Sequence, residues 1–309
     1  KPAVFDISGW NAMPYLDMGE FYSEYGSFDV RITVPKNYVV AATGELQTIS
    51  EHQWIDSLIT VFKGDTLVPP TGRKKRSIAD AFPPSDSKTK TIRFVQNKVH
   101  DFAWFADKRY RIHRDTVELP VSKRKVVCTA MFLKQRLPLW KNATKYLKDA
   151  VLHYSAKVGE YPYSVVTAVE GALEAGGGME YPTITVIGNA GSASSLDEVI
   201  THEVGHNWFY GILGSNERKN PWMDEGINSY YERIYMKRKY PNQPLFGVFG
   251  KTKLAGMLDL KRWKQADLNY LAYLLQAREN RDQAATLPAY EFTSMNTGIM
   301  VYMKTAVLL

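Results

Sequence analysis

A short motif with metal-binding spacing lies in the second half of the sequence, His202-Glu203-Val204-Gly205-His206. Residues four positions apart lie on one face of a helix, so the two histidines can offer imidazole nitrogens to one ion while Glu203 projects beside them. This geometry suits tetrahedral zinc with one open coordination position. Helices also carry histidine and glutamate on solvated faces, so the motif predicts a zinc site only if a third ligand exists.

A candidate for the third ligand is Glu225, with eighteen residues between it and His206. Asn220 and Pro221 precede it and predict the start of a second helix, because proline is favoured in the first helical turn. A glutamate among aromatic neighbours is costly to bury unless it is paired or bound to metal. Two histidines and one glutamate form a ligand set of catalytic zinc sites, so we predict one Zn2+ ion held by His202, His206 and Glu225.

A glycine-rich segment lies upstream of the zinc motif and ends in Gly177-Gly178-Met179-Glu180. Glycines let a bound peptide backbone approach a strand closely, and a carboxylate near a metal can bind a free α-ammonium group. Without the zinc motif, a flexible turn and an exposed acid would be the simpler interpretation. Next to that motif, these four residues predict a substrate-binding segment.

Together these motifs resemble those of the zinc aminopeptidase family typified by aminopeptidase N and leukotriene hydrolase, which are gluzincin metallopeptidases. In that family a glycine-rich segment ending in Met-Glu precedes the zinc helix, and its glutamate binds the substrate amine. The resemblance therefore gives this role to Glu180. Tyr181 departs from the family, which usually has asparagine at this position. The resemblance extends over most of the chain and implies a bacterial member of the family.

The same resemblance identifies Tyr302 as a candidate stabiliser of the transition state. The family has Tyr-x-Lys-Gly on a helix after the third ligand, and Tyr302-Met303-Lys304-Thr305 is similar, with threonine in place of glycine. The tyrosine would donate its hydroxyl to the oxygen on which charge develops. Its separation from Glu225 is longer than usual for the family, and a packed aromatic side chain is the alternative interpretation.

The resemblance implies an enzyme that removes residues from a peptide substrate with a free N-terminus. Glu203 would act as general base and then as general acid, taking a proton from water and passing it to the leaving amine. A thermolysin-like zinc endopeptidase would share the zinc ligands without needing an amine anchor, and a non-catalytic scaffold of the same fold is a further alternative. The preferred N-terminal residue, the physiological substrate and the oligomeric state do not follow from the sequence.

The elements that must position these residues change from strands to helices along the chain. Period-two and β-branched patterns predict strands at 28–34, 38–43, 55–62, 91–99 and 110–119. Apolar residues at spacings of three and four predict one helix over 138–158, followed by strands at 165–169 and 183–187. Ser195 and Glu198 have capping-box spacing, so the helix of the zinc motif should begin near Ser195.

This order of elements predicts an α+β protein. We expect residues 1–110 to form part of an N-terminal β domain of sandwich or saddle type, and 111–309 a thermolysin-like catalytic domain with a mixed sheet and zinc-bearing helices. Phe21–Pro35 and Asp101–Trp104 resemble parts of the family's β domain. The family has more β structure before this point and more helices after the tyrosine, so we expect a fragment that is incomplete at both ends.

Composition limits the other functions. The 309 residues include 39 Lys and Arg against 32 Asp and Glu, but the densest basic run, Arg73–Arg76, lies in a polar stretch that predicts a solvated loop. We therefore expect no nucleic-acid partner. The single cysteine, Cys128, excludes an intrachain disulfide. No stretch has the length and apolar character of a membrane helix and no targeting segment is visible, so the compartment stays open, with a preference for a periplasmic or secreted location.

Overall fold

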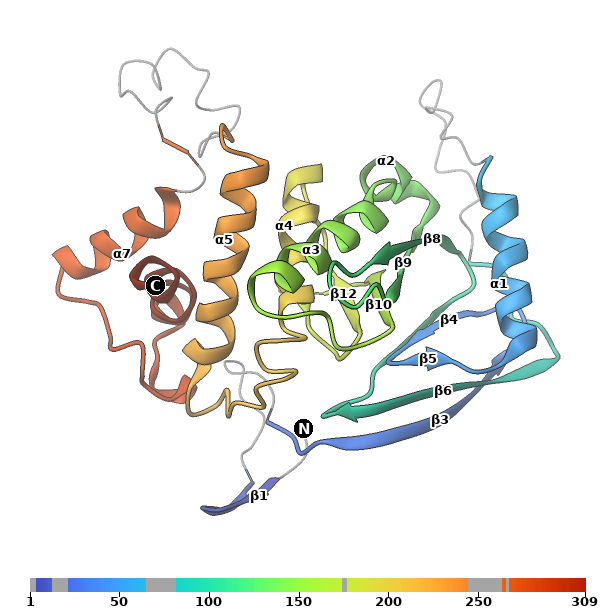
Figure 1. Ribbon diagram of the computed structural model, residues 1–309, viewed down its shortest axis with the longest axis horizontal. Helices are drawn as coiled ribbons and strands as arrows, with labels where there is room; N and C mark the ends of the chain where they lie inside the picture. The colour runs from blue at the N-terminus through green and yellow to red at the C-terminus, as the bar shows by residue number, and fades with distance from the viewer. Residues whose placement is uncertain (1–3, 13–21, 65–81, 174–176, 244–262, 265–266) are drawn as a thin grey trace. The chain divides into compact units, whose positions relative to one another are not determined.

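The computed structural model describes residues 4–12, 22–64, 82–173, 177–243, 263–264 and 267–309. The chain divides into a larger compact unit, Tyr25–Asn207, and a smaller one formed by Lys1–Glu24 and Trp208–Leu309. Figure 1 labels their elements. The basic run Arg73–Arg76 lies outside the described residues. The predicted boundary near residue 110 separates a β domain from a catalytic domain, whereas these two units are compact parts of the chain with a boundary after Asn207. The domain boundary therefore stays a prediction.

A five-stranded mixed sheet organises the larger unit, with the strand order β11-β12-β10-β9-β8. Its strands are β8 (Tyr110–Glu118), β9 (Lys125–Leu133), β10 (Val165–Glu170), β11 (Gly178–Met179) and β12 (Ile184–Ile187). β9, β10 and β12 are parallel, whereas β8 and β11 run antiparallel to their neighbours at the two edges. The predicted mixed sheet and the strands predicted at 165–169 and 183–187 are confirmed.

Helices pack on both faces of this sheet (Figure 1). Successive strand residues point to opposite faces, so neighbours in β9 contact different helices. Phe132 stacks on Trp140 of the short helix α2 (Leu137–Trp140), which follows the turn η2 (Lys134–Arg136). Met131 belongs instead to a core cluster with Ile55 of α1 (Ile49–Phe62). α3 (Ala143–Lys157) and α4 (Ala193–Gly205) pack against each other, and α4 also contacts β12.

α1 is a helix where the β-branched pattern predicts a strand over 55–62, so that prediction is wrong. Ile55 is buried, and Leu58 and Ile59 are packed against the same core cluster. These spacings of three and four place the side chains on one helical face. Burial of that face against the sheet outweighs the β preference of the branched residues.

Two further helix predictions need correction. The single helix predicted over 138–158 is broken into α2 and α3, because Asn142 leaves helical geometry, with φ −104° and ψ 6°. The zinc-motif helix starts at Ala193, near Ser195 as predicted, but Ser195 is not its cap. Its N-cap is Ser192, whose Oγ accepts a hydrogen bond from Ser195 N at 3.1 Å, and this contact replaces the predicted capping box.

Two smaller sheets complete the larger unit. One has the order β3-β6-β5, formed by β3 (Gly26–Pro35), β6 (Thr89–Val99) and β5 (Glu45–Leu46), and the other pairs β4 (Val39–Ala42) with β7 (Trp104–Asp107). Their shared core includes Ile32, Val40 and Ile92. The strands predicted at 28–34, 38–43, 91–99 and 110–119 are thus confirmed as elements.

The smaller unit is mainly helical. Its elements are the hairpin β1 (Val4–Asp6) and β2 (Gly9–Asn11), the π-helical turn η3 (Trp222–Gly226), α5 (Ile227–Lys239), α7 (Leu268–Arg278), η7 (Ala289–Glu291), α8 (Ser294–Asn296), the π-helix η8 (Thr297–Lys304) and α9 (Thr305–Leu308). Phe292, Met300 and Val301 form its buried cluster. Among the described residues, no helix combines the length and apolar character needed to cross a membrane.

Candidate zinc site

The two motif histidines face each other at the end of α4, where His202 lies in the last turn and His206 is the C-cap residue. His202 Nε2 and His206 Nε2 are 3.1 Å apart, and the ring planes are inclined at 79°. Two nitrogens that bind one tetrahedral zinc at about 2.0–2.1 Å lie roughly 3.3 Å apart. His206 is buried and His202 is half-buried, so the pair lies at the border of the core. The donor atoms and their spacing therefore fit a shared zinc ion.

Two buried carboxylates accompany the histidines in the larger unit. One ligand atom each from Glu180, Glu203 and His206 lies within 4.8 Å of the other two. The exposed fractions of Glu180 and Glu203 are 7% and 5%. Such burial is costly for an ionised carboxylate unless a cation or hydrogen-bond donors compensate it. A cation bound between these groups would provide that compensation.

The edge strand β11 lies directly against the Glu203 side chain, and one glycine makes this approach possible. A Cβ atom at Gly178 would lie 2.5 Å from Cγ, Cδ and Oε1 of Glu203. Gly177 has φ +68°, a conformation that favours glycine. Gly177 is exposed, Gly178 and Met179 are half-buried, and the preceding residues 174–176 lie outside the described part of the chain. The structure therefore places the predicted substrate-binding segment beside Glu203.

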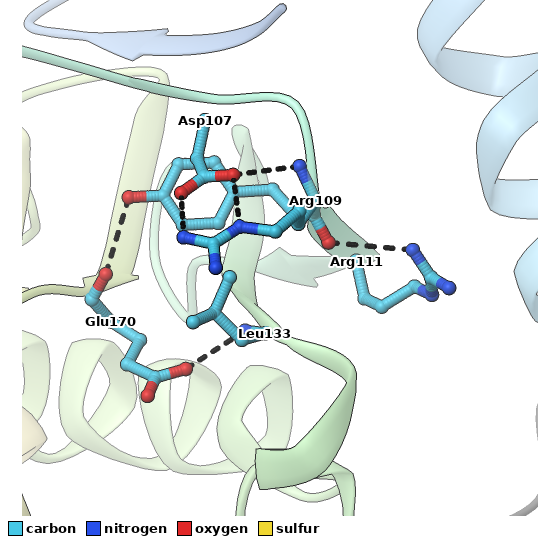
Figure 2. A network of polar contacts seen from close by, with 6 residues as sticks. Asp107, Arg109, Arg111, Leu133 and Glu170 are labelled. Carbon is cyan, nitrogen blue, oxygen red and sulfur yellow. Dashed lines mark hydrogen bonds and ion pairs between the residues drawn. The ribbon is translucent and has the colours of Figure 1, made fainter. Parts of the chain in front are cut away.

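A polar network fixes the end of β10, where the glycine-rich segment begins (Figure 2). The Glu170 carboxylate accepts hydrogen bonds from Leu133 N at 2.8 Å and from Arg136 Nε at 2.9 Å. Its backbone carbonyl accepts a third from the Tyr110 hydroxyl at 3.2 Å. The entry to the segment that carries Glu180 is thereby tied to β9 and β8.

An ion pair lies beside this network, between Asp107 and Arg109 at 2.6 Å (Figure 2). Burial acts to raise the pKa of the Asp107 carboxyl, but the hydrogen bonds from Arg109 outweigh it and leave that pKa below its usual value. The aspartate therefore stays charged and keeps its partner near neutral pH.

The remaining predicted residues lie in the smaller unit. Glu225 is buried in η3, and Tyr302 is half-buried in η8 next to the core cluster of that unit. Gly226 lets η3 and η8 approach closely, because a Cβ there would lie 2.5 Å from Thr305 Cγ2 and 2.6 Å from Val301 O. The structure thus brings Gly178, Glu180 and the motif residues together in one unit, whereas Glu225 and Tyr302 lie on two elements of the other unit, η3 and η8, that pack against each other.

Asn207 is a site neighbour that the motifs do not predict. It follows His206 directly, is 7% exposed, and accepts a hydrogen bond from Thr183 N at 3.1 Å. Its Nδ2 donates to Val204 O at 3.0 Å. In the sequence, Asn207 is marked only as a polar residue between His206 and the aromatic pair Trp208-Phe209. Its partner is 24 residues away in sequence, so no local pattern could have identified the contact.

A cavity of about 440 Å³ lies in another part of the larger unit, between β4, α1 and the strands β9 and β10. Its lining includes Ala41, Ile55, Thr129 and Thr167, with Lys125 among the charged residues. None of the predicted site residues lines it, so it does not enlarge the candidate zinc site.

Solved structures with the same fold include zinc metallopeptidases. The M1 zinc metallopeptidase from Deinococcus radiodurans superposes with a TM-score of 0.54 and 16% identity, over 92% of this chain and 52% of that chain. A mutant of that enzyme bound to a Tyr-Ser-Ala substrate gives the same values, except that 51% of its chain is covered. Legionella pneumophila aminopeptidase A gives a TM-score of 0.50 and 12% identity over 75% of this chain and 25% of that one. At these identities the likeness establishes the fold.

Sequence similarity to characterised proteins is confined to a short stretch. Mouse aminopeptidase Q is 38% identical over 60 residues, which is 19% of this chain and 11% of that protein. Human aminopeptidase Q is 35% identical over 54 residues, 16% of this chain and 6% of that protein. No protein-family model matches the sequence. The chain has the fold of the M1 zinc metallopeptidases and a segment similar to aminopeptidase Q, which confirms the predicted resemblance to the gluzincin aminopeptidase family.

Proposed function

We propose that this chain carries the catalytic core of a zinc-dependent aminopeptidase. The observation that carries the proposal is the group formed by Glu180, Glu203 and His206, whose ligand atoms lie within 4.8 Å of one another beside His202. A histidine pair and a neighbouring carboxylate are the parts of a hydrolytic zinc site, and a second carboxylate adds a place for a substrate amine.

We assign His202, His206 and Glu225 as the ligands of one Zn2+ ion. The histidine nitrogens have the spacing of two zinc ligands, and Glu225 completes a set of two histidines and one glutamate. Glu225 is also buried, which an ionised carboxylate tolerates when it binds metal. When bound, zinc would polarise the scissile carbonyl and make a water molecule more acidic.

Glu203 is assigned as the general base and acid. It sits between the two histidines in sequence and its carboxylate is almost completely buried. Close packing against Gly178 holds the carboxylate on the side of the edge strand. From there it would remove the proton of the attacking water and deliver it to the leaving amine nitrogen.

Glu180 and β11 are assigned to substrate binding. A free N-terminal ammonium group carries a positive charge, which the Glu180 carboxylate can pair with through charge-assisted hydrogen bonds. β11 is the last strand of the sheet order, so an extended peptide can pair with its backbone. This arrangement would restrict cleavage to the first residue of a peptide.

Tyr302 is assigned to the transition state. Its family-like position and its place on η8, which packs against the turn that carries Glu225, support a hydroxyl near the reacting carbonyl. The hydroxyl would donate a hydrogen bond to the oxygen on which negative charge develops.

The proposal is tested with one peptide in two forms, one with a free amine and one N-acetylated, and with the full gene product loaded with zinc. Glu203→Gln is the control and should retain zinc while losing turnover. Cleavage of the free form alone would support an aminopeptidase with Glu180 as anchor. Equal cleavage of both forms would indicate an endopeptidase, and cleavage of neither, with zinc bound, would indicate a non-catalytic scaffold.

A further inference from the structure

Thr183 holds a backbone conformation that its side chain disfavours. Its φ is +62°, and a β-branched residue rarely adopts this region unless the surroundings fix it. The residue is 1% exposed, and each of its polar backbone groups and its hydroxyl has a partner. Its N donates to Asn207 Oδ1 at 3.1 Å, its O accepts from Thr167 N at 2.9 Å, and its Oγ1 accepts from Gly44 N at 2.8 Å.

These three bonds join three separate elements at one residue. Thr167 belongs to β10, Gly44 follows β4, and Asn207 follows the last residue of the zinc motif. Thr183 is also three residues beyond Glu180, inside a turn in which Ile184 N donates to Tyr181 O at 3.1 Å. The turn that directly follows the proposed amine anchor therefore contains a residue bonded to the end of the zinc helix.

Asn207 is in turn fixed on the helix side. Its Nδ2 donates to Val204 O at 3.0 Å, so the side chain is held by the last turn of α4. The Tyr161 hydroxyl lies 3.5 Å from Asn207 Oδ1 and adds a weaker contact from outside the helix. With both ends of its amide engaged, Asn207 can present its oxygen to Thr183 in only one orientation.

We propose that Asn207 is a positioning residue that, through its hydrogen bond with the backbone N of residue 183, holds Glu180 at a fixed separation from the zinc motif, and thereby sets the affinity for a free amine. This inference rests on the proposed function. The upstream side of the anchor is held independently, because Thr185 Oγ1 donates to Met179 O at 3.0 Å. Loss of the Asn207 contact would therefore shift the turn that follows Glu180, while the pairing of β11 with β12 remains.

The test uses the zinc-loaded full gene product and two paired substitutions. Asn207→Leu removes the acceptor for Thr183 N. Thr183→Val removes only the Oγ1 contact with Gly44 and keeps the backbone N that donates to Asn207. It is therefore the matched control. If Asn207→Leu does not fold, Asn207→Gln displaces the acceptor by one methylene and carries the same expectation.

Two readouts separate positioning from a merely structural role. For a free-amine peptide, Asn207→Leu should raise KM about tenfold or more with kcat changed less than about threefold, because binding of the amine rather than the chemical step is disturbed. Hydrogen exchange of the peptide containing residues 179–187 should become faster in this variant. Zinc content should match the wild type, and Thr183→Val should stay within about threefold of the wild-type KM.

The inference would be overturned by a kcat loss as large as the rise in KM, or by an unchanged KM despite faster exchange. It would also be overturned if Thr183→Val raised KM as much as Asn207→Leu. Failure of the proposed function looks different, because the wild type itself would then not distinguish free from N-acetylated peptide, whereas the exchange rates would still report the Asn207–Thr183 bond.

Discussion

Gly178 and Glu203 are packed so closely that no side chain fits between them. A Cβ atom at position 178 would lie 2.5 Å from three atoms of the glutamate side chain. The glycine belongs to the edge strand β11, and the glutamate belongs to α4. The position of the proposed general base therefore depends on a residue that has no side chain, and this makes the contact testable.

Gly178→Ala should displace the Glu203 carboxylate and lower kcat by about a hundredfold, since small errors in the placement of a catalytic group cost that much. Zinc content should be unchanged, because the histidines are not touched. The measurement is steady-state hydrolysis of a free-amine peptide together with metal analysis. Gly191→Ala is the matched control, since a Cβ there meets nothing within 4 Å. A kcat within twofold of the wild type would contradict the assigned contact.

Tyr302→Phe should lower kcat by about a hundredfold while KM changes little, because the hydroxyl would stabilise charge that is present only in the transition state. Tyr290 is the nearby alternative and is 53% exposed. Tyr290→Phe should therefore leave both constants unchanged. If the two variants exchanged these effects, the assignment of the family tyrosine to position 302 would be wrong.

The local parts of the site could be predicted from sequence because they depend on helix geometry. His202 and His206 are four residues apart, and this spacing alone fixes their shared face. Gly178 and Glu180 could be predicted only from their position upstream of the zinc motif and from the family resemblance, since a glycine run by itself indicates no more than a turn. The contact between Gly178 and Glu203 joins residues 25 positions apart and needed the structure.

The predictions that the structure corrects failed because contacts outside the local pattern decided the outcome. Ile55, Leu58 and Ile59 satisfy a helical period as well as a strand pattern, and only the sheet that they cover decides between the two. Ser195 has the spacing of a cap, but Ser192 provides the acceptor, and one turn of helix separates the two possibilities. Asn207 could not be predicted because its role is to bond Thr183, which is distant in sequence.

Gly226→Ala should destabilise the smaller unit by about 1–3 kcal/mol, because the added methyl group would overlap Thr305 and Val301 O. If Glu225 is a zinc ligand, the displaced turn should also weaken zinc binding. Urea unfolding of the apo protein and a zinc titration measure the two effects separately. Gly298→Ala is the matched control, because a Cβ at that helical glycine meets nothing within 4 Å and alanine should stabilise by up to about 1 kcal/mol. Equal effects of the two substitutions would exclude the packing argument.

His100 should make the larger unit less stable in acid. Burial lowers the pKa of its imidazole to about 4, against an ordinary value of 6.5, and the ring packs edge-on against Tyr25. The unfolded chain therefore takes up a proton more readily than the folded one, so this contribution to stability is present above about pH 6.5 and is lost as the pH falls towards 4. At pH 4.5 the loss should be about 2–3 kcal/mol, because that pH lies about two units below the ordinary pKa and each unit is worth roughly 1.4 kcal/mol.

The measurement is the free energy of unfolding in urea at pH 7 and at pH 4.5, for the wild type and for His100→Phe. The aromatic replacement cannot be protonated, so the difference between the two pH values should become smaller. It should not vanish, because burial also lowers the pKa of His113, against an opposing hydrogen bond with the backbone of Lys141. An unchanged pH dependence in His100→Phe would show that the imidazole is protonated at no cost in the folded state, and that the Tyr25 side of this core admits water.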